Sequence, residues 1–154
     1  MPQVEVDRVK HRGKANFMSF GENIAPLVGR ILIASLFMLA GVDKMQHWNA
    51  AALSMSQHGV SMIGPLLAAA VAVEIGAGFG LMIGFRTRVM ALALFMFTLV
   101  VNFVMHDFWT IANADLARVE MQLFAKNMAI AGGLLVLVGL GAGSWSYDSL
   151  RGDG

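Results

Sequence analysis

Long apolar stretches alternate with short polar connections along this chain, and charged residues are sparse inside the stretches. A helix needs about 20 residues to cross the hydrocarbon core of a bilayer, and four stretches are near this length. They are apolar nearly all round, whereas a helix of a soluble bundle needs a wide polar face. The pattern therefore predicts an all-α integral membrane protein, a four-transmembrane-helix bundle with spans at residues 23–43, 65–84, 89–106 and 121–142.

The segments outside these spans are too short for a second domain. Residues 1–22 form a basic tail, and residues 149–154 form a C-terminal tail. The connection after the first span contains WNAAALSMSQHG, whose small and apolar residues recur at helical spacing and predict a short interfacial helix. The first span is longer than the apolar region of a typical signal peptide and no clear cleavage site follows it, so we expect it to remain as a helix.

Lysines and arginines predict the orientation of the bundle, because short cytoplasmic segments carry an excess of them. One side holds Lys44 and Arg118, and the other holds Arg8, Lys10, Arg12, Lys14, Arg86, Arg88 and Arg151. We therefore expect both termini in the cytoplasm and the connections 44–64 and 107–120 in the outer compartment. The chain would lie in a bacterial inner membrane. Its net charge of +1 predicts no nucleic-acid partner.

The sequence contains no cysteine, which excludes covalent haem attachment through thioethers and an iron–sulfur cluster held by thiolates. Any redox chemistry would then belong to a bound molecule or to a partner protein. The first outer connection brings methionine and histidine side chains close in sequence, and these suit copper(I), but no methionine motif repeats there. We predict no metal site.

One carboxylate, Glu74, lies near the centre of the second span. A charged group at the centre of a membrane helix costs about 2.5 to 3.5 kcal/mol on insertion scales, so Glu74 needs a partner or water. Counting the helical rise from the cytoplasmic helix ends puts Arg30 and Lys126 within about 6 to 8 Å of Glu74 along the membrane normal. We expect Glu74 to face the bundle interior as the central anion of a buried network with Arg30, Lys126 or both.

Other polar side chains lie in the outer half of the predicted bundle. Thr98, Asn102 and His106 recur every four residues and share one face of the third span. The resulting polar pocket has His106, Glu74 and Lys126 as its candidate catalytic residues. The candidate cofactor-binding residues are Arg30, Lys44, Asn102, Asn127 and Trp109.

Each of these residues also has a purely structural interpretation. A pair formed by Glu74 could fix the register of two helices, and Lys126 could extend its ammonium to the outer interface. The two asparagines could hold helices together, and His106 could cap a helix.

The second span carries a ridge of small residues that suits close helix contact and points roughly away from Glu74. The ridge consists of Ala68, Ala72, Gly76, Gly80 and Gly84. It either packs against an adjacent helix of the chain or marks an interface with another protein. The second option predicts a protein partner or a homo-oligomer through the part from Ala72 to Gly84.

Four motifs, in this order and at these spacings, resemble the DoxX family of small four-helix membrane proteins. They are GRILIASLFMLAGVDKM, VEIGAGFGLMIGFRTR, FVMHDFW and LFAKNMAIAGGLL, and the resemblance extends over about residues 29–148. It implies that the polar positions of the family are occupied here by Arg30, Lys44, Glu74, His106, Lys126 and Asn127.

The resemblance also implies function classes. Members of the family look like subunits of membrane oxidoreductase complexes, including the quinone-linked oxidation of thiosulfate and a redox-detoxification assembly. We therefore expect an oxidoreductase subunit that binds quinone in an outer-leaflet polar pocket, where His106 donates a proton, Lys126 or Asn127 stabilises the developing anion and Glu74 relays protons. The alternative is a non-catalytic membrane anchor or assembly subunit for a partner protein. A transporter or lipid-binding role comes third.

Overall fold

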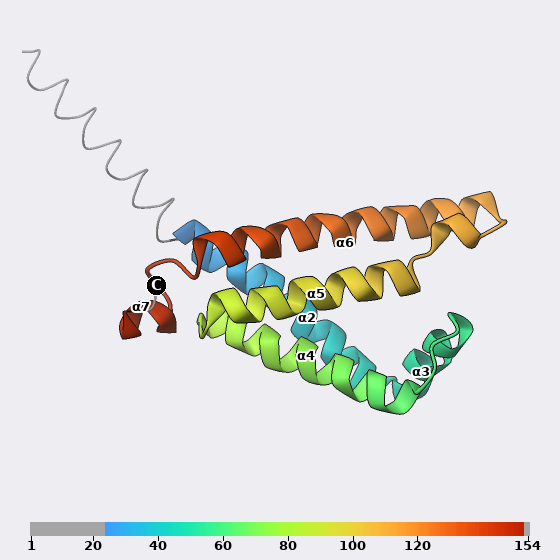
Figure 1. Ribbon diagram of the computed structural model, residues 1–154, viewed down its shortest axis with the longest axis horizontal. Coiled ribbons are helices and arrows are strands. Elements are labelled where there is room, and N and C mark those ends of the chain that lie inside the picture. The colour runs from blue at the N-terminus through green and yellow to red at the C-terminus, as the bar shows by residue number, and fades with distance from the viewer. Residues whose placement is uncertain (1–23, 153–154) are drawn as a thin grey trace, which may run out of the picture.

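A computed structural model describes residues 24–152, which form a bundle of long helices with short elements at its ends (Figure 1). The long helices are α2 (Ala25–Gln46), α4 (Ile63–Ile83), α5 (Thr87–Met105) and α6 (Ala114–Leu140). The short elements are α3 (Trp48–Gln57), the 3-10 helix η2 (Phe108–Thr110) and α7 (Tyr147–Arg151). Residues 24–152 include four helices, α5 taken together with η2, that are long and apolar enough to cross a membrane, which confirms the all-α membrane fold.

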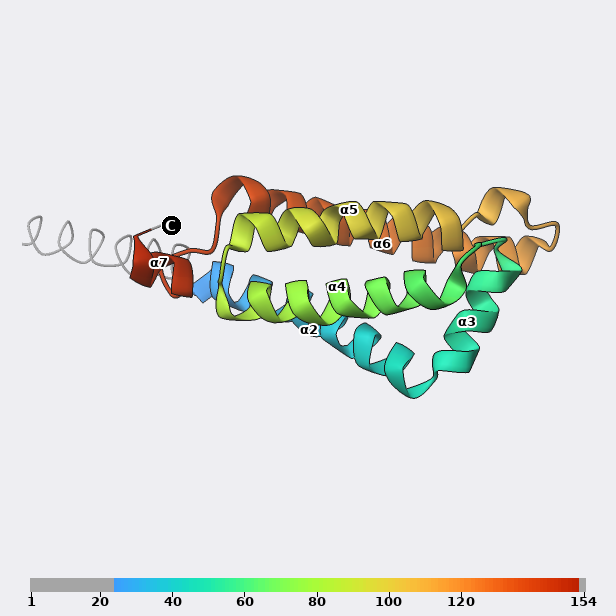
Figure 2. The same cartoon turned by 60° about the horizontal axis from the view of Figure 1, so that its bottom comes forward.

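The two ends of the described chain lie at the same end of the bundle, together with α7, and α3 lies at the opposite end (Figures 1 and 2). We call these the termini end and the α3 end. An even number of crossings returns the chain to the side from which it started. The predicted basic tail of residues 1–22 lies outside the described residues, and which end faces the cytoplasm stays a prediction.

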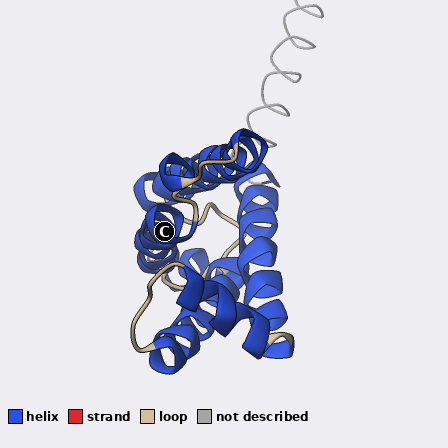
Figure 3. Cartoon of the chain, turned by 90° about the vertical axis from the view of Figure 1, so that its right-hand side faces the viewer, coloured by secondary structure: helices blue, strands red, loops and turns tan. Residues whose placement is uncertain are grey.

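Consecutive long helices pack against each other, and α6 returns to contact α2. Figure 3 shows the bundle of helices in a view along its long direction. The closest approach of α2 and α4 depends on glycines: a Cβ added at Gly41 would lie 2.7 Å from Ile75, and one at Gly78 would lie 3.0 Å from Met38. The core between the helices is apolar and includes Phe37, Leu81, Leu94 and Leu134. The buried face of α2 carries Arg30, Ala34, Phe37 and Gly41.

The observed helix ends differ from the predicted ones where polar residues continue a helix. The largest difference is at α6, which begins at Ala114, seven residues before the predicted start at residue 121. The Asn113 side chain accepts hydrogen bonds from the backbone N–H groups of Asp115 and Leu116, both at 3.0 Å, and so caps this helix. Hydropathy marks only the apolar part of a helix, so this polar first part was taken for a loop. The predicted interfacial helix is present as α3.

Candidate functional site

A small cavity with polar walls, here called the polar cavity, lies inside the bundle toward the α3 end. Its volume is about 190 Å3, and all four long helices contribute residues to its lining. Its charged and polar lining residues are Lys44, Glu74, Thr98, His106 and Asn127. Four of these residues are among the candidate site residues predicted from the sequence, and the fifth, Thr98, was predicted on the same polar face as His106.

An ion pair between Lys44 and Glu74 forms one wall of the polar cavity. The Lys44 Nζ atom donates to Glu74 Oε1 at 2.8 Å; the Glu74 residue is 3% exposed and the Lys44 side chain 29% exposed. The second carboxylate oxygen, Glu74 Oε2, is buried and has no hydrogen-bond partner among residues 24–152. An unsatisfied buried acceptor costs roughly 1–3 kcal/mol, so this oxygen favours an occupant that donates a hydrogen bond.

The local geometry of α2 explains why Lys44 reaches Glu74. A Cβ added at Gly41 would lie 3.2 Å from Glu74 Cβ, so the two helix backbones come close at this level. Lys44 lies about one turn farther along α2. Helical side chains tilt toward the helix N-terminus, and the lysine therefore leans back toward the carboxylate.

The predicted partners of Glu74, Arg30 and Lys126, are wrong. The predicted depths require the start of α2 and the end of α4 to lie level at the termini end, but a Cβ added at Gly84, just after α4, would lie 2.5 Å from Arg30 Nη1. The helix α2 therefore runs past the end of α4, and the rise from Arg30 to Gly41, beside Glu74, is about 16 Å. Lys126 is exposed on α6 and lines neither the polar cavity nor its apolar neighbour described below.

Arg30 has a different site, at the termini end. Its guanidinium is buried and donates to the backbone oxygens of Ala142 and Trp145, both at 2.7 Å. The Asp148 carboxylate accepts the backbone N–H groups of Arg86 at 2.7 Å and Thr87 at 2.8 Å, at the start of α5. These contacts join the segment after α6 to α2 and to the start of α5. Arg30 therefore lies at the termini end and does not line the polar cavity.

Asp148 lies outside the membrane-spanning segments, and its contacts shift its pKa. Burial alone would raise the pKa of this carboxyl group. The hydrogen bonds from Thr87 and Arg86 and the positive charge of Arg30 outweigh burial, and the pKa is lowered from its ordinary value.

His106 pairs with a residue that the sequence analysis missed. Its Nδ1 lies 2.7 Å from Glu120 Oε2, and both side chains are only partly exposed. When Nδ1 carries the hydrogen and donates it to the carboxylate, the tautomer is fixed and Nε2 is the ring atom left for a ligand. Glu120 was placed in a loop because its segment is polar. The sequence signal for this pair was the position of its two members: Glu120 directly precedes the fourth predicted span, and His106 ends the third predicted span on the same side of the membrane.

Two further candidates are placed outside the polar cavity. Asn102 is fully buried, and its Nδ2 donates to the Phe124 backbone oxygen at 3.2 Å, which joins α5 to α6. Trp109 is 55% exposed and contacts the rings of Phe103, Phe108 and Phe124. Because Asn102 and Trp109 do not line the polar cavity, their positions do not support the predicted role in ligand binding.

The ridge of small residues divides into two parts. Ala72 and Gly76 are exposed, and an added Cβ at Gly76 would meet nothing within 4 Å. Gly80 and Gly84 are buried inside the chain, because a Cβ at Gly80 would lie 2.9 Å from Met90 and one at Gly84 would lie 2.5 Å from Ser146. A partner interface over the whole ridge is thus ruled out, and one over its exposed part stays a prediction.

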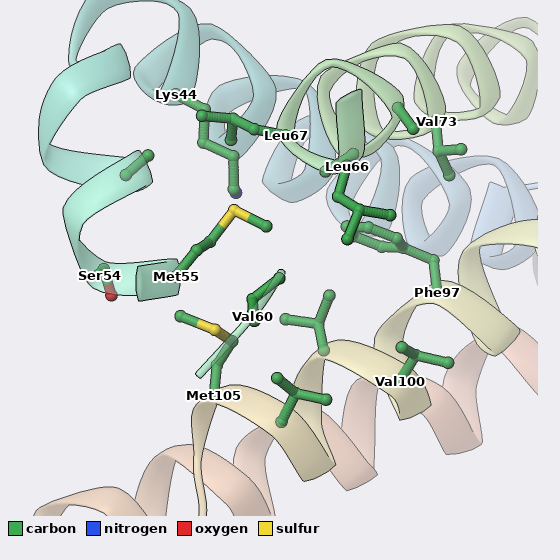
Figure 4. Close-up of a pocket in the computed structure, with 15 residues that line it drawn as sticks. Lys44, Ser54, Met55, Val60, Leu66, Leu67, Val73, Phe97, Val100 and Met105 are labelled. Atoms are coloured by element: carbon green, nitrogen blue, oxygen red, sulfur yellow. The ribbon is translucent and has the colours of Figure 1, made fainter. Parts of the chain in front are cut away.

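A second cavity, here called the apolar cavity, lies between α3, α4 and α5 and has a volume of about 400 Å3 (Figure 4). Apart from Lys44 and Ser54, every residue that lines it is apolar. Figure 4 shows Leu66 and Val73 on one wall, Phe97 and Val100 on the facing wall, and Met55 from α3. Among residues 24–152 no group of three or more histidine, cysteine or acidic side chains could hold a metal ion.

Comparisons with known proteins identify the family. The DoxX family pattern matches residues 25–107. Inner membrane protein YqjF of Escherichia coli (strain K12) is 34% identical over 129 residues, which are 84% of this chain and 93% of the relative. Inner membrane protein YphA of the same organism is 33% identical over 124 residues, 79% of this chain and 86% of the relative.

A third relative matches over a shorter segment: the uncharacterized protein T02E1.7 of Caenorhabditis elegans is 38% identical over 77 residues, 47% of this chain and 28% of the relative. No solved structure matches the chain. The apolar helices and the two inner membrane relatives confirm that the protein is integral to an inner membrane, as predicted. Together with the match to the family pattern, they establish that the chain belongs to the DoxX family.

Proposed function

We propose that the chain is the membrane subunit of an oxidoreductase and binds a quinone headgroup in the polar cavity. One observation carries the proposal: Lys44, the unsatisfied carboxylate of Glu74 and the carboxylate-bound ring of His106 belong to one cavity within a membrane bundle. Ionisable side chains that face the interior of a membrane protein mark substrate and proton pathways.

The hydrogen-bonding groups of the cavity suit both oxidation states of such a substrate. The carbonyl oxygens of a quinone accept hydrogen bonds, and Lys44 and Asn127 can donate them. The hydroxyl groups of the reduced form donate hydrogen bonds, and Glu74 Oε2 is an acceptor without a partner among the described residues. His106 Nε2 donates when the ring is protonated and accepts when it is neutral.

Reduction of a quinone to its hydroquinone consumes two electrons and two protons. We assign donation of one proton to Nε2 of the protonated His106 ring, which Glu120 keeps oriented through Nδ1. The second proton reaches the quinone through Glu74. Lys44 takes the role of stabilising the developing anion, which the sequence analysis gave to Lys126 or Asn127. The electrons come from a partner protein with the redox centre.

Titration of the purified chain in mild detergent with 2,3-dimethoxy-5-methyl-1,4-benzoquinone, a headgroup without a tail, tests the proposal. Lys44→Met and His106→Phe should each weaken binding about tenfold or more, because hydrogen bonds from charged groups are worth roughly 1.5–3 kcal/mol. The matched controls are Arg118→Met and His47→Phe, which change exposed residues outside both cavities. Equal binding by the variants and the native chain, with unchanged helical circular dichroism, would contradict the proposal.

A further inference from the structure

The polar cavity and the apolar cavity share a wall. Lys44, Phe97 and Val101 line both of them. A ligand whose polar part lies beside Lys44 and Glu74 therefore has an apolar space directly next to it. The two volumes also differ: the apolar cavity, about 400 Å3, is within the range of roughly 300–1,000 Å3 for small-molecule sites, whereas the polar cavity, about 190 Å3, is below it.

We infer that the ligand of the polar cavity carries an aliphatic tail, and that this tail lies in the apolar cavity between α4 and α5, against α3. The inference rests on the proposed function and narrows its substrate class to long-tailed, lipid-soluble quinones. A headgroup alone would fill the polar cavity and leave the larger, apolar space beside it without an occupant that matches its lining.

Exposed residues on the walls indicate how such a tail enters. Leu66 on α4 is 48% exposed, and Val100 and Val104 on α5 are 61% and 39% exposed. These residues lie on membrane-spanning helices, so their exposed surface faces lipid. The apolar cavity therefore opens sideways into the bilayer, and the tail can extend from it into the membrane while the headgroup remains beside Lys44.

The test compares two probes on the full chain in mild detergent: the tailless benzoquinone named above and decylubiquinone, which has the same headgroup and a ten-carbon chain. The variant Ala70→Phe fills the apolar cavity from α4, and the matched control Ala72→Phe adds the same group to an exposed α4 position outside both cavities. Val104→Trp obstructs the cavity from the α5 wall and serves as a second, independent variant.

Decylubiquinone should bind more tightly than the tailless probe. Ala70→Phe and Val104→Trp should weaken decylubiquinone binding about tenfold or more, since burial of each methylene group contributes a factor of about four, and should leave the tailless probe within about twofold. Ala72→Phe should change neither. If the native chain binds neither probe, the proposed function fails and the inference fails with it. If the native chain binds both probes and a folded Ala70→Phe variant binds decylubiquinone as well as the native chain does, the inference alone is overturned.

Discussion

At the scale of single residues, the Lys44 and Glu74 pair has two separable roles. Its structural role is to neutralise a carboxylate that is 3% exposed within a membrane bundle. Its proposed chemical role is to present a cation and an unsatisfied oxygen to a ligand. A buried ion pair is often replaceable by apolar residues of similar size without loss of stability, whereas removal of one partner leaves an uncompensated charge. The two roles therefore respond differently to substitution.

We predict that Lys44→Met alone lowers the free energy of unfolding by about 2 to 3 kcal/mol, below the effect of breaking a fully buried pair because the lysine side chain is 29% exposed. The double variant Lys44→Met with Glu74→Leu should recover most of this loss and still fail to bind the quinone headgroup. Unfolding in mixed detergent micelles, followed by circular dichroism, measures the stability. If the double variant were as unstable as Lys44→Met, the pair would contribute more to the free energy of unfolding than compensation of the Glu74 charge, which would contradict this prediction.

The candidate residues of the site could be selected from the sequence, but their partners could not. Glu74 and His106 were identifiable because a charged or ionisable group inside a membrane span needs an explanation. The partner of Glu74 depends on how far α2 and α4 are shifted along each other, which close packing at Gly41 and Gly78 determines. Depth counted from helix ends carries no information about that shift.

At the scale of elements, the segment after α6 stabilises the termini end through Asp148. Arg86 has a left-handed backbone with φ of 43°, which is uncommon for a residue other than glycine, and its N–H group donates to Asp148. Thr87, the first residue of α5, donates its N–H group to the same carboxylate. Asp148 thus acts as the N-terminal cap of a helix that is distant in sequence, and it holds the strained connection between α4 and α5.

We predict that Asp148→Asn destabilises the protein by about 1 to 2 kcal/mol at neutral pH, because the amide keeps only one acceptor oxygen and leaves the backbone N–H of Arg86 or Thr87 without a partner. Because folding lowers the pKa of Asp148, the native chain has this stabilisation above the ordinary pKa of an aspartate and loses it as the pH falls through the lowered pKa. Melting temperatures of the two proteins should therefore differ at pH 7 and converge in acid. A difference that stays constant with pH would mean that the charge of Asp148 is not what stabilises this end.

The ridge on α4 gives a second test at this scale. Gly80→Leu should lower the melting temperature of the isolated chain, because even a Cβ there would lie 2.9 Å from Met90 Cγ. Gly76→Leu should leave the fold of the isolated chain unchanged, since an added Cβ there would meet nothing within 4 Å apart from its own helix backbone and chain neighbours. It would weaken only an assembly formed through the exposed part of the ridge. Thermal unfolding and size-exclusion chromatography distinguish the two. Equal destabilisation by both variants would contradict the packing described.

At the scale of the whole molecule, length and hydropathy were sufficient to predict the number of membrane helices, the short helix α3 and the return of the chain to its starting side. These properties follow from the thickness of a bilayer and the rise of a helix. The early start of α6 could not be predicted from hydropathy, because its first part is polar. The contacts of Asp148 with the start of α5 could not be predicted because they join segments far apart in sequence. A polar pocket in the bundle was predicted, but the apolar cavity beside it was not, because it depends on how α3, α4 and α5 pack against one another.

Whether the polar cavity holds a quinone can be measured by native mass spectrometry of the protein released from its own membrane in mild detergent. We expect a stoichiometric, tailed quinone on the native chain and on the Arg118→Met variant, and its loss from folded Lys44→Met and His106→Phe variants. A native chain that retains a partner protein but no quinone, or a quinone that persists in both cavity variants, would contradict this expectation.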